Sequence, residues 1–112
     1  MVISNSSPFG SPSRTQVLKY LRMLSESFPR ELSRLTGSRL ASIQKALASL
    51  ERDGLVVGRS AGRMRLFTLN PRFFAARELD ALLLRLAETD SQVQRSVAEL
   101  RRRPRRTGKP LR

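Results

Sequence analysis

The sequence predicts a mainly α-helical domain with one small β-hairpin, in the order α-α-α-β-β-α. Three observations predict this class. Apolar residues recur at helical spacing in several stretches, two short strand-like segments lie before the last of them, and Gly, Pro and Asn mark the boundaries. The 112 residues are enough for one domain and too few for two well-formed cores.

A flexible arm and two helices are expected before residue 37. Residues 1–13 are rich in Ser, Pro and Gly, a composition typical of an arm. Ser13 is a good N-cap for a first helix that ends near Ser27. The apolar side of this helix carries Val17, Leu18, Leu21, Leu24 and Phe28. Pro29 suits the first position of a short second helix, and Gly37 ends it because Gly tolerates a left-handed backbone.

A third helix is expected from about residue 38 to residue 53. Ser38 is its expected N-cap, and Gly54 is the residue that ends it. The buried stripe of this helix is predicted at i, i+3, i+7 and i+10, namely Leu40, Ile43, Leu47 and Leu50. The outward side then carries only small or polar residues, namely Arg39, Ala41, Ser42, Gln44 and Lys45.

A β-hairpin and a last helix are expected after residue 54. Strands at 55–57 and 63–69 flank a turn at 58–62 that contains two Gly residues. Asn70 and Pro71 are the expected N-cap and first residue of the last helix. Its apolar line consists of Leu79, Leu83, Leu86, Val93, Val97 and Leu100, with Leu82 beside it. Asp90 interrupts this line, so the sequence leaves open whether the helix continues through 89–91.

The strongly basic composition favours a polyanionic partner, with nucleic acid first. The net charge is +13, from 22 Lys and Arg against 9 Asp and Glu. Residues 101–112 hold seven of the basic side chains and no acidic one, yet residues 1–100 still carry +6. We expect 101–112 to be a disordered tail that either contacts phosphates without sequence preference or only improves solubility.

The absence of Cys and His excludes whole classes of chemistry. Disulfides, zinc sites with Cys or His ligands, Cys nucleophiles and Ser-His-Asp triads all require these residues. No catalytic residue, metal site or cofactor is therefore predicted. The chain has no apolar run near the ~18 residues of a membrane helix, and its start lacks signal-peptide features. The expected location is the cytoplasm, at the nucleoid.

A family resemblance covers roughly residues 9–87. Residues 31–56, ELSRLTGSRLASIQKALASLERDGLV, resemble without a gap the pattern E-L-A-x-x-T-G-x-S-x-x-T-V-S-x-x-L-x-x-L-E-x-x-G-L-V of winged helix-turn-helix transcriptional regulators. Residues 62–71, GRMRLFTLNP, are similar to the wing and linker of ArsR-like and MarR-like members. Residues 9–11, with Arg14, Val17 and Leu18, resemble the F-G-S-x-x-R-x-x-I-L start of the ArsR-like group. Ser38-Arg39 departs from the usual apolar-Ser pair. The missing Cys and His exclude the metal sensing of ArsR members.

The resemblance implies a regulator, expected to be a repressor, that binds specific double-stranded DNA through a domain at 14–70. In this fold the second helix of the motif enters the major groove, and the wing contacts the backbone or minor groove. The predicted DNA-binding residues are Ser38, Arg39, Ala41, Ser42, Gln44 and Lys45 on the helix, and Arg59, Arg63 and Arg65 on the wing. Arg39 can pair with guanine and Gln44 with adenine. A plain solvated surface remains the alternative for all of them, and equally for Arg30 and Arg34.

A homodimer is expected through residues 71–100, because so small a domain has more apolar surface than it can bury by itself. The expected interface residues are Leu79, Leu82, Leu83, Leu86 and Val93. Packing of the same stripe onto the chain's own first helix is the alternative. A two-fold dimer would place its recognition helices ~34 Å apart, over a palindromic site.

Two other function classes stay open beside DNA binding. A winged helix can dock a protein or structured RNA, although such domains usually expose apolar residues on the third helix. The Asn-Pro-Arg linker also resembles that of nucleotidyltransferase chains, but no Gly-Ser with paired Asp follows Asn70. An effector or a further protein partner is left open by the sequence.

Overall fold

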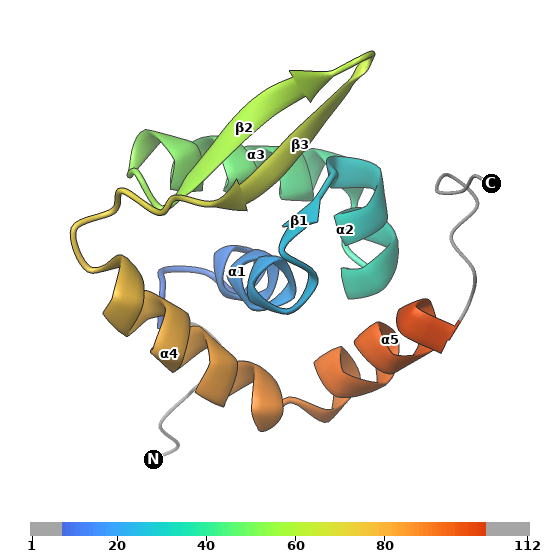
Figure 1. Ribbon diagram of the computed structural model, residues 1–112. Coiled ribbons are helices and arrows are strands. Elements are labelled where there is room, and N and C mark those ends of the chain that lie inside the picture. Colours follow the sequence, from blue (N-terminus) through green and yellow to red (C-terminus); the bar gives the residue numbers. More distant parts are fainter. Residues whose placement is uncertain (1–7, 103–112) are drawn as a thin grey trace, which may run out of the picture.

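The computed structural model describes residues 8–102 and confirms the predicted class, a mainly helical domain with a small antiparallel sheet. Its elements are α1 (Pro12–Leu24), β1 (Glu26–Ser27), α2 (Pro29–Thr36), α3 (Leu40–Arg52), β2 (Val56–Ala61), β3 (Met64–Leu69), α4 (Ala76–Glu88) and α5 (Ser91–Arg102). Helix α1 lies in the middle, with α3 and the sheet on one side and α4 and α5 on the other (Figure 1). Residues 103–112, most of the predicted tail, lie outside the described part.

Helix α1 begins and ends earlier than its sequence predicts. Its N-cap is Ser11, whose Oγ accepts a hydrogen bond from the Arg14 N–H at 3.1 Å. Ser13 was the wrong choice, because Pro12 has the fixed φ that suits the first helical turn. The helix stops at Leu24, and Ser25 has a φ of 75°. The next two residues leave the helix to form β1.

The sheet has three strands in the order β1-β3-β2, all antiparallel. Strand β2 extends to Ala61, and the turn is the residue pair Gly62-Arg63, with a φ of 66° at Gly62. The predicted turn at 58–62 was therefore too long. A two-residue turn with a left-handed Gly suits the right-handed twist of a hairpin, and it leaves residues 58–61 free to pair with β3. We call this β2–β3 hairpin the wing.

The predicted last helix is two helices, and it starts later than expected. Asn70 does not cap a helix: its Oδ1 accepts the Arg72 N–H at 2.9 Å, and its Nδ2 donates to the Gly54 carbonyl at 2.9 Å. Helix α4 begins only at Ala76. The chain then breaks after Glu88, because Asp90 caps α5 by accepting the N–H groups of residues 92 and 93.

One apolar core joins all five helices and the sheet. Helix α3 buries Ile43, Leu47 and Leu50 as predicted, but Leu40 is only half-buried. The other large buried members include Val17, Leu18, Tyr20 and Leu21 of α1, Leu32 of α2, Val56 and Phe67 of the wing, and Leu83, Val93 and Val97 of α4 and α5. At ~1.5–3 kcal/mol for each large side chain, this burial holds α1 between the two outer layers.

Within residues 8–102, no helix has the length and apolar character needed to cross a membrane.

Candidate nucleic-acid interface

The turn between α2 and α3 is held by three side-chain and backbone features. Gly37 ends α2 with a φ of 76°, in the left-handed region that favours glycine. The Thr36 Oγ1 donates to the Leu32 carbonyl at 2.8 Å and accepts the Ser38 N–H at 3.1 Å. The Ser33 hydroxyl donates to the Ser38 carbonyl at 2.6 Å. These bonds fix the direction in which α3 leaves the turn.

Ser38 therefore belongs to the turn and is not the N-cap of α3 that the sequence predicts. Helix α3 begins at Leu40, its N-cap is Arg39, and no side chain bonds to its first N–H groups. Both backbone polar groups of Ser38 are bonded within the turn, which pulls this residue out of the cap position. The N-terminus of α3 thus presents N–H groups without a side-chain partner, which suits an anion.

The outward face of α3 carries the five remaining helix residues predicted to bind DNA. All five are exposed, namely Arg39, Ala41, Ser42, Gln44 and Lys45. Ile43, Ala46 and Leu47 face the core between them. Ala41 and Ser42 give the first turn of this face small side chains, and Gln44 and Lys45 make its middle polar. No large apolar side chain is exposed on it. That combination allows close approach to a polar surface.

The three wing arginines, all predicted from the sequence to contact DNA, have different partners in the structure. Arg63 lies in the exposed Gly62-Arg63 turn. The Arg65 Nη2 lies 3.1 Å from the Glu51 Oε2, and its guanidinium lies 4.9 Å from the centre of the Phe67 ring. The Arg59 Nη2 lies 3.2 Å from the Glu26 Oε1 of β1. Of the three, only Arg63 has no ion pair among the described residues.

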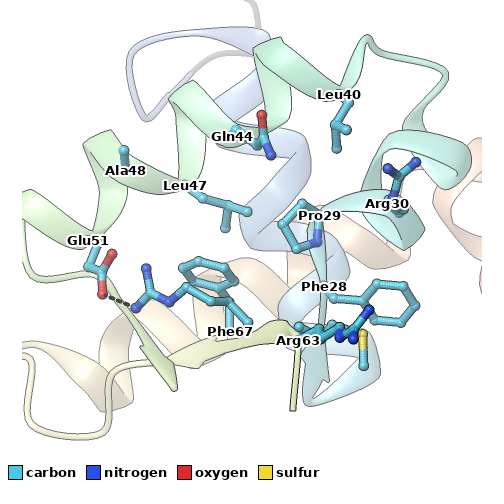
Figure 2. Close-up of a pocket in the computed structure, with 12 residues that line it drawn as sticks. Phe28, Pro29, Arg30, Leu40, Gln44, Leu47, Ala48, Glu51, Arg63 and Phe67 are labelled. Carbon is cyan, nitrogen blue, oxygen red and sulfur yellow. Dashed lines mark hydrogen bonds and ion pairs between the residues drawn. The ribbon is translucent and has the colours of Figure 1, made fainter. Parts of the chain in front are cut away.

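An open groove of about 600 Å³ lies between α3, the start of α2 and the wing (Figure 2). Phe28, Pro29, Leu40, Leu47 and Phe67 give it an apolar lining. Arg30, Arg63 and Arg65 are its basic residues, and Glu51 is its acidic one. Phe28 and Pro29 were missed as site residues, because only the fold brings the start of α2 next to the wing.

The residues predicted for a dimer interface divide into two groups. Leu79, Leu83 and Val93 are buried within the single chain, with relative exposures of 8%, 0% and 0%. The alternative of packing onto the chain's own first helix thus describes these three. Leu82 is 46% exposed, and Leu86 is half-buried. Phe74, just before α4, is 93% exposed and was not predicted.

A polar contact between α1 and the α4–α5 junction lies on the side of α1 away from the wing. The Lys19 Nζ donates to the Asp90 Oδ2 at 2.9 Å, and Lys19 is 5% exposed. Burial alone would raise the pKa of Asp90, but the hydrogen bond and charge of Lys19, with bonds from the Val93 N–H and Gln16, lower it overall. Burial raises the pKa of Tyr20, and the nearby Asp90 charge adds to the rise although a hydrogen bond with Ser96 opposes it.

No group of three or more acidic residues within 8–102 is placed to hold a metal ion. The helix pair, its Gly turn and the adjoining wing define a winged helix-turn-helix domain, as the sequence predicts. This is the fold class of the chain.

Two solved structures share this fold. The chain is similar to the adhesin competence repressor AdcR from Streptococcus pyogenes, with a TM-score of 0.58 and 15% identity over 88% of this chain and 80% of that chain. It is also similar to a mutant of ZitR from Lactococcus lactis, with a TM-score of 0.54 and 14% identity over 91% of this chain and 66% of that chain. No protein-family model matches the chain, and no curated protein matches it in sequence. These two similarities show the winged helix-turn-helix fold of this chain.

Proposed function

We propose that this protein is a transcriptional repressor that binds a specific double-stranded DNA sequence as a homodimer in the cytoplasm. The observation that carries the proposal is the outward face of α3, which is exposed, polar and free of large apolar side chains. A winged helix that docks a protein would present apolar residues at these positions. The name of the similar repressor from Streptococcus pyogenes agrees with the proposed role.

The residues of α3 have distinct roles in the proposed complex. Ala41 and Ser42 are small, so the first turn of the helix can approach the floor of the major groove. Arg39 pairs with the O6 and N7 of a guanine, and Gln44 pairs with the N6 and N7 of an adenine. Lys45 reaches a base edge or a phosphate. The uncapped N–H groups at the start of α3 bind a phosphate of the same strand.

The groove beside α3 adds contacts to the DNA backbone. Arg30 and Arg63 stand on α2 and in the wing turn, and both are exposed. A phosphodiester chain that runs between them would meet positive charge from both sides. The backbone groups of Ser38 hold the turn that directs α3, and its side chain is a further proposed contact to the DNA.

The proposed dimer uses the outer face of α4. Leu82 and Leu86 supply its apolar contacts, and the exposed Phe74, just before α4, is a further candidate contact. Leu79, Leu83 and Val93 support α4 and α5 from beneath, because they are buried against the core of their own chain.

The test is a selection of bound sequences from a random DNA duplex pool at about 150 mM salt, where purely electrostatic binding is already weak. We expect a palindromic motif with half-sites about one helical turn apart. Recovery of no motif would overturn sequence-specific binding and favour a protein or RNA partner.

Single substitutions then test the assigned face. On the selected site, Arg39→Ala or Lys45→Ala should each cost ~1–3 kcal/mol of binding free energy. Arg95→Ala is the matched control, because Arg95 is exposed on α5, on the other side of α1. Equal affinities for all three variants would remove α3 from the interface.

A further inference from the structure

We propose that Glu51, Arg65 and Phe67 form a clamp that sets the position of the wing relative to α3. Arg65 is then a positioning residue, and the direct contact of the wing with DNA falls to Arg63. The part of this inference that concerns DNA rests on the proposed function. The part that concerns the position of the wing does not.

The clamp joins two elements through one guanidinium. Glu51 belongs to the last turn of α3, and its Oε2 lies 3.1 Å from the Arg65 Nη2 of β3. The same guanidinium lies over the Phe67 ring, 4.9 Å from its centre, on the same face of the strand. Figure 2 shows the dashed ion pair between Glu51 and Arg65 beside the Phe67 ring.

Gly58 gives this guanidinium its space. A Cβ at Gly58 would lie 2.5 Å from the Arg65 Nη2 and 2.8 Å from the Phe67 Cε2, so neither side chain could keep its place. The backbone conformation of residue 58 does not require a glycine, because its φ is not positive. A glycine inside a strand is unfavourable unless something approaches closely, and here the approaching groups are the two members of the clamp on β3.

The clamp connects the wing to α3 outside the apolar core. At the base of the wing, Val56 and Phe67 are 0% and 5% exposed and belong to the core. Beyond them, residues 60–65 are exposed or half-buried, so core packing does not hold the tip. The ion pair of Arg65 with Glu51 is therefore the interaction that fixes the tip, and with it Arg63 and the width of the groove.

A second ion pair of the wing provides a matched control. The Arg59 Nη2 lies 3.2 Å from the Glu26 Oε1, a separation close to that of the clamp. Arg59 follows Gly58 in β2, so its side chain lies on the opposite face of the sheet, away from the clamp. Loss of this pair removes a wing ion pair without touching the connection to α3.

Spin-label distances test the position of the wing without any DNA. The chain has no cysteine, so Ala61→Cys in the wing and Gln92→Cys on α5 label it at two chosen sites. We expect Glu51→Gln and Arg65→Met each to shift and broaden this distance distribution. Glu26→Gln should leave it unchanged. A second label pair, Ser42→Cys with Gln92→Cys, should be unchanged in every variant, and melting curves show that each variant is folded.

An unchanged 61–92 distribution in both clamp variants would overturn the clamp. A change that spreads equally to the 42–92 pair would also overturn it, because the effect would then be general loosening. These outcomes do not depend on whether the protein binds DNA. Failure of the wild-type protein to select any DNA motif would count against the proposed function alone.

Footprinting on the selected site tests the assignment of Arg63. We expect Arg63→Ala to remove backbone protection on the wing side and to keep protection under α3. Arg65→Met should weaken the same protection and raise Kd by about fivefold or less, the range of a partly exposed ion pair. Wing protection that is lost in Arg65→Met while the 61–92 distance stays unchanged would make Arg65 a direct contact and refute the inference.

Discussion

The ion pair between Lys19 and Asp90 is expected to hold α5 against α1, and the substitution Asp90→Asn tests this. Lys19 lies in the middle of α1 with its side chain 6% exposed, and the Asp90 side chain is 19% exposed. Asn keeps an Oδ1 that can accept the N–H groups at the start of α5, so the helix cap survives. The substitution therefore removes the counter-charge of a buried ammonium group and little else.

The expected cost follows from the burial of the two partners. Removal of one partner of a buried ion pair costs ~3–5 kcal/mol. Because some water reaches Asp90, we expect ~2–3 kcal/mol, a large share of the ~5–15 kcal/mol typical of a small domain. The control is Asp80→Asn, which breaks the pair with Arg22 at 2.9 Å, where the Asp80 side chain is 54% exposed. That pair should contribute less than ~1 kcal/mol.

Urea denaturation at pH 7, followed by circular dichroism, measures both free energies of unfolding. The double variant Lys19→Met with Asp90→Asn should regain most of the loss, because it no longer buries an unpaired charge. The reasoning is refuted if Asp90→Asn costs no more than Asp80→Asn. It is also refuted if the double variant is less stable than the single one.

Three further predictions concern pH, assembly and the basic end of the chain. The pKa of Asp90 is lowered in the folded protein, so its ionised form stabilises the fold fully above the unfolded pKa of about 3.9. This stabilisation is lost as the pH falls through the lower folded pKa. In Asp90→Asn the free energy of unfolding should therefore fall less steeply with decreasing pH. Leu82→Glu with Leu86→Glu should shift the sedimentation of the protein toward a monomer, whereas Leu83→Ala should cost ~2–5 kcal/mol of folding stability. A dimer that persists in the Glu variant would place the interface elsewhere. Deletion of 101–112 should reduce the slope of log K against log salt and leave the selected motif unchanged, and a changed motif would show that the tail reads sequence.

The parts of the fold that the sequence predicted correctly are those with a local signal. The stripe of Ile43, Leu47 and Leu50 repeats over three turns, so the buried side of α3 can be read from spacing alone. Gly37 and Gly54 mark the ends of α2 and α3, and both have the left-handed backbone that this role requires.

The errors arose where a distant part of the chain decides the local structure. Strand β1 has two residues, too few to show a period, and it exists only because Glu26 and Ser27 pair with β3 some forty positions away. Asn is a residue type that often caps a helix, but the side chain of Asn70 donates a hydrogen bond to the Gly54 carbonyl instead. Apolar spacing favoured a first helix that continues to residue 27, and residue type favoured a cap at Asn70. Tertiary contacts overrode both.

The site shows the same division. Exposure of the polar face of α3 follows from helical period, so those residues were predicted correctly as surface. The roles of the three wing arginines do not follow from period, because their partners, Glu26 and Glu51, belong to β1 and α3. A sequence shows that an arginine is present, whereas its availability for DNA depends on which carboxylate the fold brings near it.

The break at Asp90 also changes the argument for a dimer. A continuous helix would carry its apolar stripe away from the domain, and a second subunit would have to cover it. Since the chain turns at residues 89–90, α4 and α5 both pack against α1. Leu83, Val93 and Val97 are buried in the core that these helices share. The apolar surface left on α4 is its outer face around Leu82. In Figure 1 this helix lies on the opposite side of α1 from α3 and the wing. A dimer built on α4 and a DNA site built on α3 therefore use separate surfaces, so one chain can engage both partners at once.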